Sequence, residues 1–192
     1  MNTTLKWILG ILVGGMLLCL VIVVLGLVLF NATTRSVISG VQAEPGEAAS
    51  VAAQIADFAL PEGYTSAVAT QFAHLEVVGY NGPDGHSHIY LIQLPPGVRV
   101  DQAALESQLQ SSAGDQGSQY GPDMRIIEQQ PVTIRGQATT LVVSEGTNGE
   151  GRSIRSANAA FEGKDGQALL SISGSTDGWD AAMVEAFIGS MK

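Results

Sequence analysis

The residues with the clearest potential for chemistry are two histidines, His86 and His88, separated by a single residue. If this segment is a strand, both imidazoles project from the same face and could share a metal ion. A hairpin centred on Pro83 would place His88 opposite Val78 and diagonal to Glu76, whose carboxylate would be a third ligand. The pattern therefore gives one candidate metal site, formed by His86, His88 and Glu76.

The third histidine, His74, does not join this candidate site. It lies four residues along the same expected strand from Val78, roughly 13 Å at ~3.3 Å per residue. A closed structural zinc site has four protein ligands, which is more than this arrangement offers. A pair of surface histidines beside a turn is therefore the competing interpretation.

No other residues form a recognisable catalytic pattern. The sequence has no G-x-S-x-G elbow for a nucleophilic serine, and its only cysteine, Cys19, lies inside an apolar run. The glycine-rich segment 146–151 lacks the Lys-Ser/Thr pair that completes a phosphate-binding loop, so we interpret it as a hairpin tip. We expect neither enzymatic activity nor a cofactor.

The charge of the chain narrows its range of partners. The sequence has 9 basic and 18 acidic residues, and its formal net charge is −9. All the acidic residues follow Phe30, so this later part holds 8 basic and 18 acidic residues and a formal charge of −10. Nucleic acid and anionic headgroups are bound by clustered Lys and Arg, which are scattered singly here. We therefore expect no nucleic-acid partner.

The run from Trp7 to Phe30 is 24 residues long and carries no charge. As a helix it would extend roughly 36 Å, against a hydrocarbon core of ~30 Å. The apolar region of a cleaved signal peptide is shorter, about 7–15 residues. A lipoprotein signal is also disfavoured, because Leu18 rather than a small residue precedes Cys19. The run predicts an uncleaved signal-anchor that crosses the lipid bilayer once.

Few charges bear on the orientation of this anchor. Lys6 precedes it and Arg35 follows it, so the positive-inside bias is slight. The short tail cannot fold alone, which favours a cytoplasmic N-terminus in the cell membrane and a large domain outside. Gly10 and Gly14 have the GxxxG spacing that would allow weak dimerisation. The expected regions are a cytoplasmic tail (1–6), a transmembrane helix (7–30), a stalk (31–46) and an extracytoplasmic α+β domain (47–192).

Beyond the stalk, apolar spacing predicts helices and strands. Val51, Ile55 and Phe58 fall at helical spacing and predict a helix over 47–58, before Pro61. Asp101 can cap a second helix that ends near residue 112. Period-two alternation predicts strands over 71–80, 86–94, 125–128, 132–143 (interrupted by Gly136), 153–161 and 167–173.

The C-terminal segment predicts a further helix. Trp179, Met183 and Phe187 repeat every four residues, and Asp177 with Asp180 would form a cap at its start. We therefore expect an α+β protein. Its predicted fold is one N-terminal transmembrane helix followed by a mostly antiparallel sheet of five to seven strands packed against two or three helices.

Four segments give this order of elements a resemblance to a known fold. They are "FALPEGY" at 58–64, "IYLIQLP" at 89–95, "AAFEGKDGQALLSISGS" at 159–175 and "WDAAMVEAFIGSMK" at 179–192. Because of these four segments, the chain from about residue 52 onward resembles the PsbP-like fold, which is known from extrinsic photosynthetic subunits and bacterial envelope domains. The resemblance implies a non-enzymatic binding or assembly role and supplies no site residue.

We therefore expect a membrane-tethered extracytoplasmic binding or assembly module with a protein partner in the cell envelope. The alternative is an extracytoplasmic sensor that binds a small molecule or a metal ion. An exposed flat patch on the sheet would favour the protein partner, and a concave apolar pocket would favour the sensor.

Overall fold

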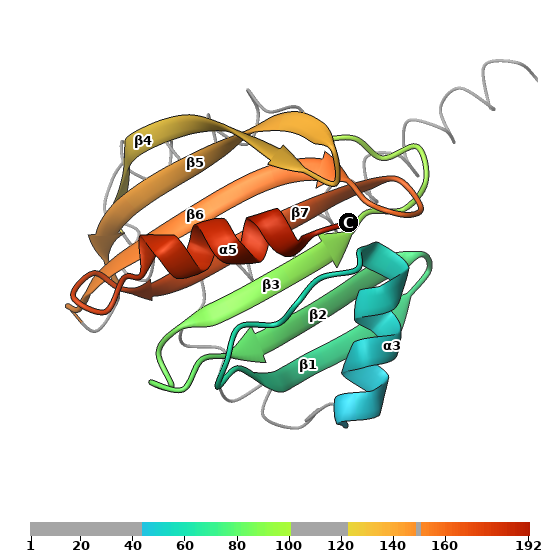
Figure 1. Ribbon diagram of the computed structural model, residues 1–192, viewed down its shortest axis with the longest axis horizontal. Coiled ribbons are helices and arrows are strands. Elements are labelled where there is room, and N and C mark those ends of the chain that lie inside the picture. The colour runs from blue at the N-terminus through green and yellow to red at the C-terminus, as the bar shows by residue number, and fades with distance from the viewer. Residues whose placement is uncertain (1–43, 101–122, 149–150) are drawn as a thin grey trace, which may run out of the picture.

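The structure, a computed structural model, describes residues 44–100, 123–148 and 151–192. Within them the chain forms one seven-stranded antiparallel sheet and two helices (Figure 1). The strand order is β1-β2-β3-β7-β6-β5-β4, so two sequential meanders are joined by the pairing of β3 with β7. The elements are α3 (Pro45–Ile55), β1 (Thr65–Phe72), β2 (Leu75–Asn81), β3 (His88–Gln93), β4 (Asp123–Ile134), β5 (Gln137–Thr147), β6 (Ser153–Glu162), β7 (Gln167–Ser175) and α5 (Ala181–Ser190).

The predicted fold class is wrong. In place of a mostly antiparallel sheet of five to seven strands with two or three helices and a membrane span, the described residues form a wholly antiparallel sheet of seven strands with two short helices. Neither helix in these ranges is long and apolar enough to cross a membrane. The predicted span at 7–30 and the predicted helix at 101–112 lie outside the described residues.

Seven strands lie within the predicted range of five to seven, but the bounds of several strands were wrong because two tight turns were not recognised. Ala73 and His74 have φ of 48° and 65° and join β1 to β2, dividing the single strand predicted over 71–80. Arg135 and Gly136 have φ of 52° and 76° and join β4 to β5, where the sequence had predicted an interrupted strand. Two successive positive φ values are typical of two-residue hairpin loops, which usually contain Asn-Gly or Asp-Gly. Ala73-His74 carries no such signal.

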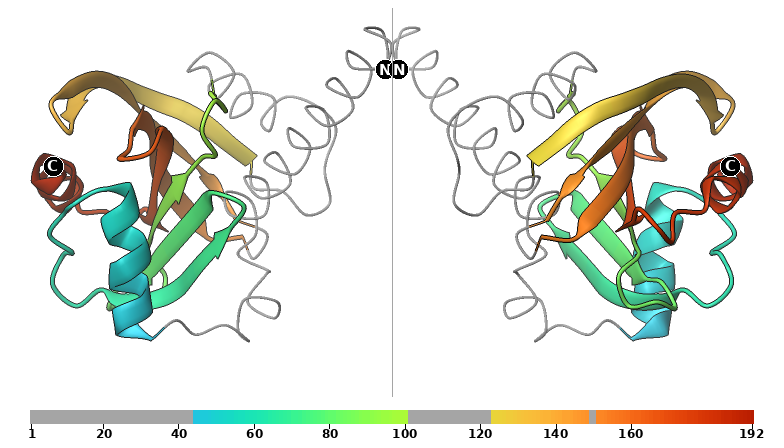
Figure 2. Two further views of the ribbon diagram at one scale, coloured as in Figure 1. Left: turned by 90° about the vertical axis from the view of Figure 1, so that its right-hand side faces the viewer. Right: turned by 90° about the vertical axis from the view of Figure 1, so that its left-hand side faces the viewer.

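Both helices cover the same face of the sheet, which we call the helix-covered face (Figure 2). α3 lies over β1, β2 and β3, and it buries Ala48, Val51 and Ile55. α5 buries Val184, Phe187 and Ile188 in the same core. Strand residues that alternate toward this face, such as Val78, Leu91 and Leu170, complete the cluster.

The boundaries of both helices differ from those predicted. α3 ends at Ile55, well before Pro61, and Phe58 packs edge-on against Phe187 with ring centroids 5.3 Å apart. α5 begins after Asp180, whose carboxylate accepts a hydrogen bond from the Met183 N–H at 3.0 Å. The predicted cap at Asp177 is therefore wrong. The aspartate nearest the first free N–H groups takes that role.

The opposite face of the sheet has a smaller apolar cluster, and we call it the second face. Its centre is formed by Val77, Ile92, Leu94, Ala160 and Leu169, with Val98 and Val100 packed against them. These residues alternate along their strands with those of the helix-covered face. The two faces therefore bury separate groups of side chains.

Candidate functional site

The two histidines of the candidate metal site lie at one end of the sheet and have different neighbours. The His88 Nδ1 atom is 2.9 Å from the Asn81 side-chain oxygen, and His88 pairs with Asn81 across the β2–β3 hairpin. The His86 ring lies in the turn, with both nitrogens 3.4–3.5 Å from a guanidinium nitrogen of Arg152. Each imidazole thus contacts a different polar group.

Glu76, the expected third ligand, lies at the other end of the hairpin. It pairs with Gln93, whereas His88 pairs with Asn81, five residues further along β2. At ~3.3 Å per residue this separation is roughly 16 Å. The expected diagonal between Glu76 and His88 is wrong because the loop closes between Gly82 and Ser87, which moves the register by three residues. In the part of the chain that the structure describes, no three His, Cys, Asp or Glu side chains gather as metal ligands.

The structure instead places the buried Glu76 in a polar group with two exposed glutamines, Gln71 of β1 and Gln54 of α3. Its Oε1 accepts a hydrogen bond of 3.2 Å from the Gln71 amide, which also donates to Gln54 of α3 at 2.9 Å. Glu76 is 5% exposed, and its Oε2 has no hydrogen-bond partner among the described residues. Gln71 therefore links the edge hairpin to the helix above it.

The turn that carries His86 contains aspartate, serine and histidine within four residues. The Asp84 carboxylate accepts hydrogen bonds from the His86 N–H at 2.9 Å, the Ser87 N–H at 2.7 Å and the Ser87 hydroxyl at 2.7 Å. Burial raises the pKa of Asp84, but these hydrogen bonds outweigh it and hold the pKa below its ordinary value. The serine hydroxyl donates to the carboxylate and not to an imidazole, as a Ser-His-Asp triad would require. The arrangement fixes the turn.

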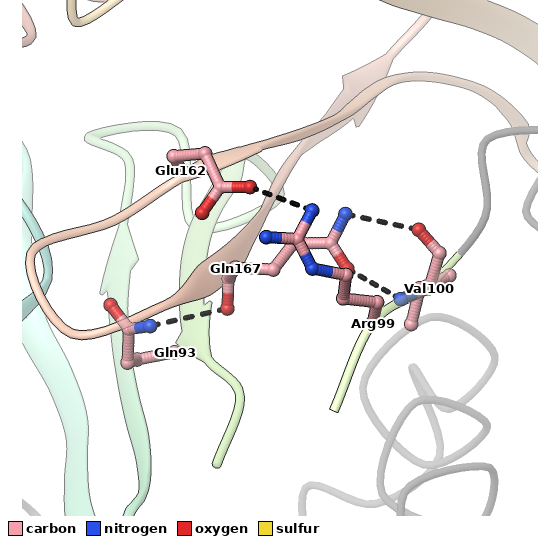
Figure 3. A network of polar contacts seen from close by, with 5 residues as sticks. All are labelled: Gln93, Arg99, Val100, Glu162 and Gln167. Carbon is pink, nitrogen blue, oxygen red and sulfur yellow. Dashed lines mark hydrogen bonds and ion pairs between the residues drawn. The ribbon is translucent and has the colours of Figure 1, made fainter. Parts of the chain in front are cut away.

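A second polar network connects the segment that follows β3, which includes Arg99 and Val100, to the second face (Figure 3). The Gln167 side chain accepts from the Val100 N–H and donates to the Val100 carbonyl at 3.0 Å, as a neighbouring strand would. Gln93 donates to the Gln167 carbonyl at 3.2 Å, and Arg99 pairs with Glu162 at 3.4 Å. The Arg99 side chain is 76% exposed, so this ion pair adds little stability. The two Gln167 contacts hold Val100 against the apolar cluster.

The second face also contains a row of polar side chains, in which Ser144 and Asn158 are buried and Ser156 is half-buried. Ser144 and Ser156 share a hydrogen bond of 2.9 Å, and the Asn158 amide donates to Ser156 at 3.2 Å. Asn158 is 3% exposed, yet its Oδ1 finds no partner among the described residues. Sequence reasoning missed this row, because polar residues at every second position normally indicate the solvent-facing side of a strand.

The most exposed apolar feature lies at an edge of the sheet. Phe72 ends the edge strand β1 and is 69% exposed, the highest value among the large hydrophobic side chains that the structure describes. β1 (TSAVATQF) has no charged residue and no proline. The opposite edge strand, β4, carries Arg125, Glu128 and Pro131 and has a bulge between Ile126 and Glu128. Sequence reasoning missed this contrast because it did not identify β1 as a strand.

Comparisons with known proteins do not identify the chain: no known family model matches it, and no curated protein matches it.

Proposed function

We propose that this protein is a non-enzymatic binding or assembly module, tethered to the cell membrane through residues 7–30, with its folded domain outside the cytoplasm. Its partner is a protein that adds a strand to the outer edge of β1. The uncharged, apolar run of residues 7–30 and the size of the region that follows it support the tether and its orientation. The resemblance to PsbP-like envelope domains agrees with such a role and stays a prediction.

The observation that carries the proposal is the contrast between the two edges of one sheet. An edge strand presents a row of backbone N–H and C=O groups that can pair with another chain. Natural proteins block such edges with charge, proline or bulges, and β4 has all three. β1 has only a bulge between Ser66 and Val68, so the stretch from Val68 to Phe72 is regular and neutral.

The exposed Phe72 ring adds an apolar anchor to this edge. Phe72 pairs with Leu75 of β2, and Leu75 packs against the cluster of the second face. A partner strand beside β1 would therefore gain backbone hydrogen bonds and cover an aromatic side chain at the same time. Strand addition commonly obtains affinity from the main chain and specificity from such side-chain contacts.

Site-specific photo-cross-linking in intact cells tests the proposal. A photoreactive phenylalanine analogue replaces Phe72, and in a matched variant it replaces Ile127, the exposed hydrophobic side chain of β4, which is 40% exposed. We expect a discrete protein adduct from position 72 and none from position 127.

A single charge provides the control. Thr70 is exposed on β1 and Thr133 is exposed on β4. Thr70→Lys introduces the kind of charge that blocks natural edges and should abolish the adduct, whereas Thr133→Lys should leave it unchanged. Equal adducts from both edges, or none from position 72, would contradict β1 as the partner surface.

A further inference from the structure

We propose that the strand added to β1 is the β1 strand of a second copy of this chain, antiparallel and centred on Thr70. This inference rests on the proposed function, because it names the partner of the same edge. The two copies would join their sheets through the regular stretch from Val68 to Phe72.

This stretch is complementary to itself. With Thr70 opposite its own copy, Phe72 lies opposite Val68 and Gln71 lies opposite Ala69. Val68, Thr70 and Phe72 share the second face, because they pair with Gly79, Val77 and Leu75 of β2. Aromatic–β-branched and Thr–Thr pairs directly across two strands each stabilise a sheet by roughly 0.2–1 kcal/mol. The symmetric register provides two Phe72–Val68 pairs and one Thr70–Thr70 pair.

The charge distribution favours a copy of the same chain over a charged partner. The described residues include 14 acidic and 7 basic side chains, so most surfaces of two copies repel one another. β1 has no charged side chain, and the symmetric register places no like charges opposite each other. A basic partner would be attracted to the acidic domain, but nothing on β1 would direct it to this edge.

The size of the contact sets its strength. The bulge at Ala67 ends the regular edge after five residues, Val68 to Phe72. Interfaces of this extent are small and usually transient between freely diffusing molecules. Two copies held in one membrane have a much higher effective concentration, which favours a weak contact. We therefore expect pairing in the bilayer and dissociation on dilution in detergent.

Disulfide trapping tests the register in the full-length chain in membranes, with Cys19→Ser removing the native thiol. Facing residues of an antiparallel pair have Cα atoms about 4.5–5.5 Å apart, within the range of a disulfide. We expect Thr70→Cys to form a disulfide-linked dimer under mild oxidation. The matched variant Thr133→Cys, on the other edge, should stay monomeric. No Thr70→Cys dimer, or equal dimers from the two variants, would overturn the proposal.

Charge exchange separates self-pairing from other partners. Thr70→Lys and Thr70→Glu should each abolish chemical cross-linking of two differently tagged copies in the membrane, because like charges then face each other at the dyad. Mixing the Lys and Glu variants should restore it, and continued pairing of either variant alone would overturn the proposal. If position 72 cross-links a different protein while Thr70→Cys forms no dimer, self-pairing is excluded and the proposed function stands. If position 72 gives no adduct and Thr70→Cys forms no dimer, the proposed function and the self-pairing are both excluded.

Discussion

The two faces of the sheet bury side chains of different kinds. The helix-covered face has the larger apolar cluster, with Phe187, Ile55 and Leu170 each 1% exposed or less, and its two buried polar side chains, Glu76 and Gln93, pair with each other at one end of β2 and β3. The second face buries Val142 and Leu169 beside a polar row that contains Asn158. Backbone pairing across the sheet is shared by both faces. The helix-covered face therefore buries the larger group of apolar side chains, whereas on the second face a buried polar row lies among the apolar residues of the central strands, where an unpaired polar atom costs stability.

Truncation of a core side chain on the helix-covered face should have the largest effect. Phe187 contacts Phe58 at a centroid distance of 5.3 Å and is 1% exposed. Phe187→Ala should lower the free energy of unfolding by about 3–5 kcal/mol, because it removes the ring and leaves a cavity. Such domains are commonly stable by about 5–15 kcal/mol, so urea melts should show a large shift.

The matched control for this truncation is on the same helix. Glu185 is exposed, and Glu185→Ala should change the free energy of unfolding by no more than roughly 0.5 kcal/mol. Similar urea midpoints for the two variants would mean that α5 does not pack on the sheet.

Tight packing on the second face should give an intermediate effect. Gly79 of β2 lies beneath the Tyr90 ring, and a Cβ at this position would be 2.5 Å from the ring and 2.8 Å from Val68. Gly79→Ala should therefore cost about 1–3 kcal/mol through overpacking. Gly189 of α5 has open space around it, and Gly189→Ala should stabilise the protein by about 0.5–1 kcal/mol. Thermal melts that shift both variants in the same direction would contradict this packing.

Removing polarity from the second face should have the smallest effect. An unsatisfied buried polar atom costs about 1–3 kcal/mol, and the Asn158 Oδ1 lacks a partner among the described residues. Asn158→Leu should thus leave the free energy of unfolding within about 1 kcal/mol of the parent, or raise it.

The reciprocal substitution on the helix-covered face sharpens the comparison. Leu170 is 1% exposed in the apolar core, and Leu170→Asn should cost more than about 3 kcal/mol. Chemical denaturation of both variants checks the pair. A fall of more than about 2 kcal/mol in the free energy of unfolding of Asn158→Leu would show that Asn158 makes a stabilising contact. It would contradict the inference that the buried polar row costs stability.

Elements whose signals are local were predictable from the sequence. The predicted strands 153–161 and 167–173 correspond to β6 (Ser153–Glu162) and β7 (Gln167–Ser175). The helices near residues 47 and 181 were expected from apolar spacing and are present as α3 and α5. Period-two alternation, turn glycines and apolar residues at helical spacing each involve residues close together in the sequence. They can therefore be recognised from the sequence alone.

The candidate site was much less predictable, because it depended on register. His86, His88 and Glu76 were grouped by assuming a loop centred on Pro83, and pairing Asn81 with His88 instead separates them. A shift of this kind leaves the sequence pattern of each strand unchanged. Register is selected by which side chains become buried and by loop geometry, which a sequence pattern does not contain.

The sequence by itself determined that the chain is acidic, that it carries an uncharged 24-residue run at 7–30, and that most of its later segments alternate as strands. Only the tertiary structure decided that β3 pairs with β7, that both helices cover one face, and that a neutral β1 is left at an edge. These features could not be predicted because they depend on contacts between residues that are far apart in the sequence. Pairing Leu91 with Leu170 gains its free energy from joint burial of residues far apart in sequence, and no local preference encodes that contact.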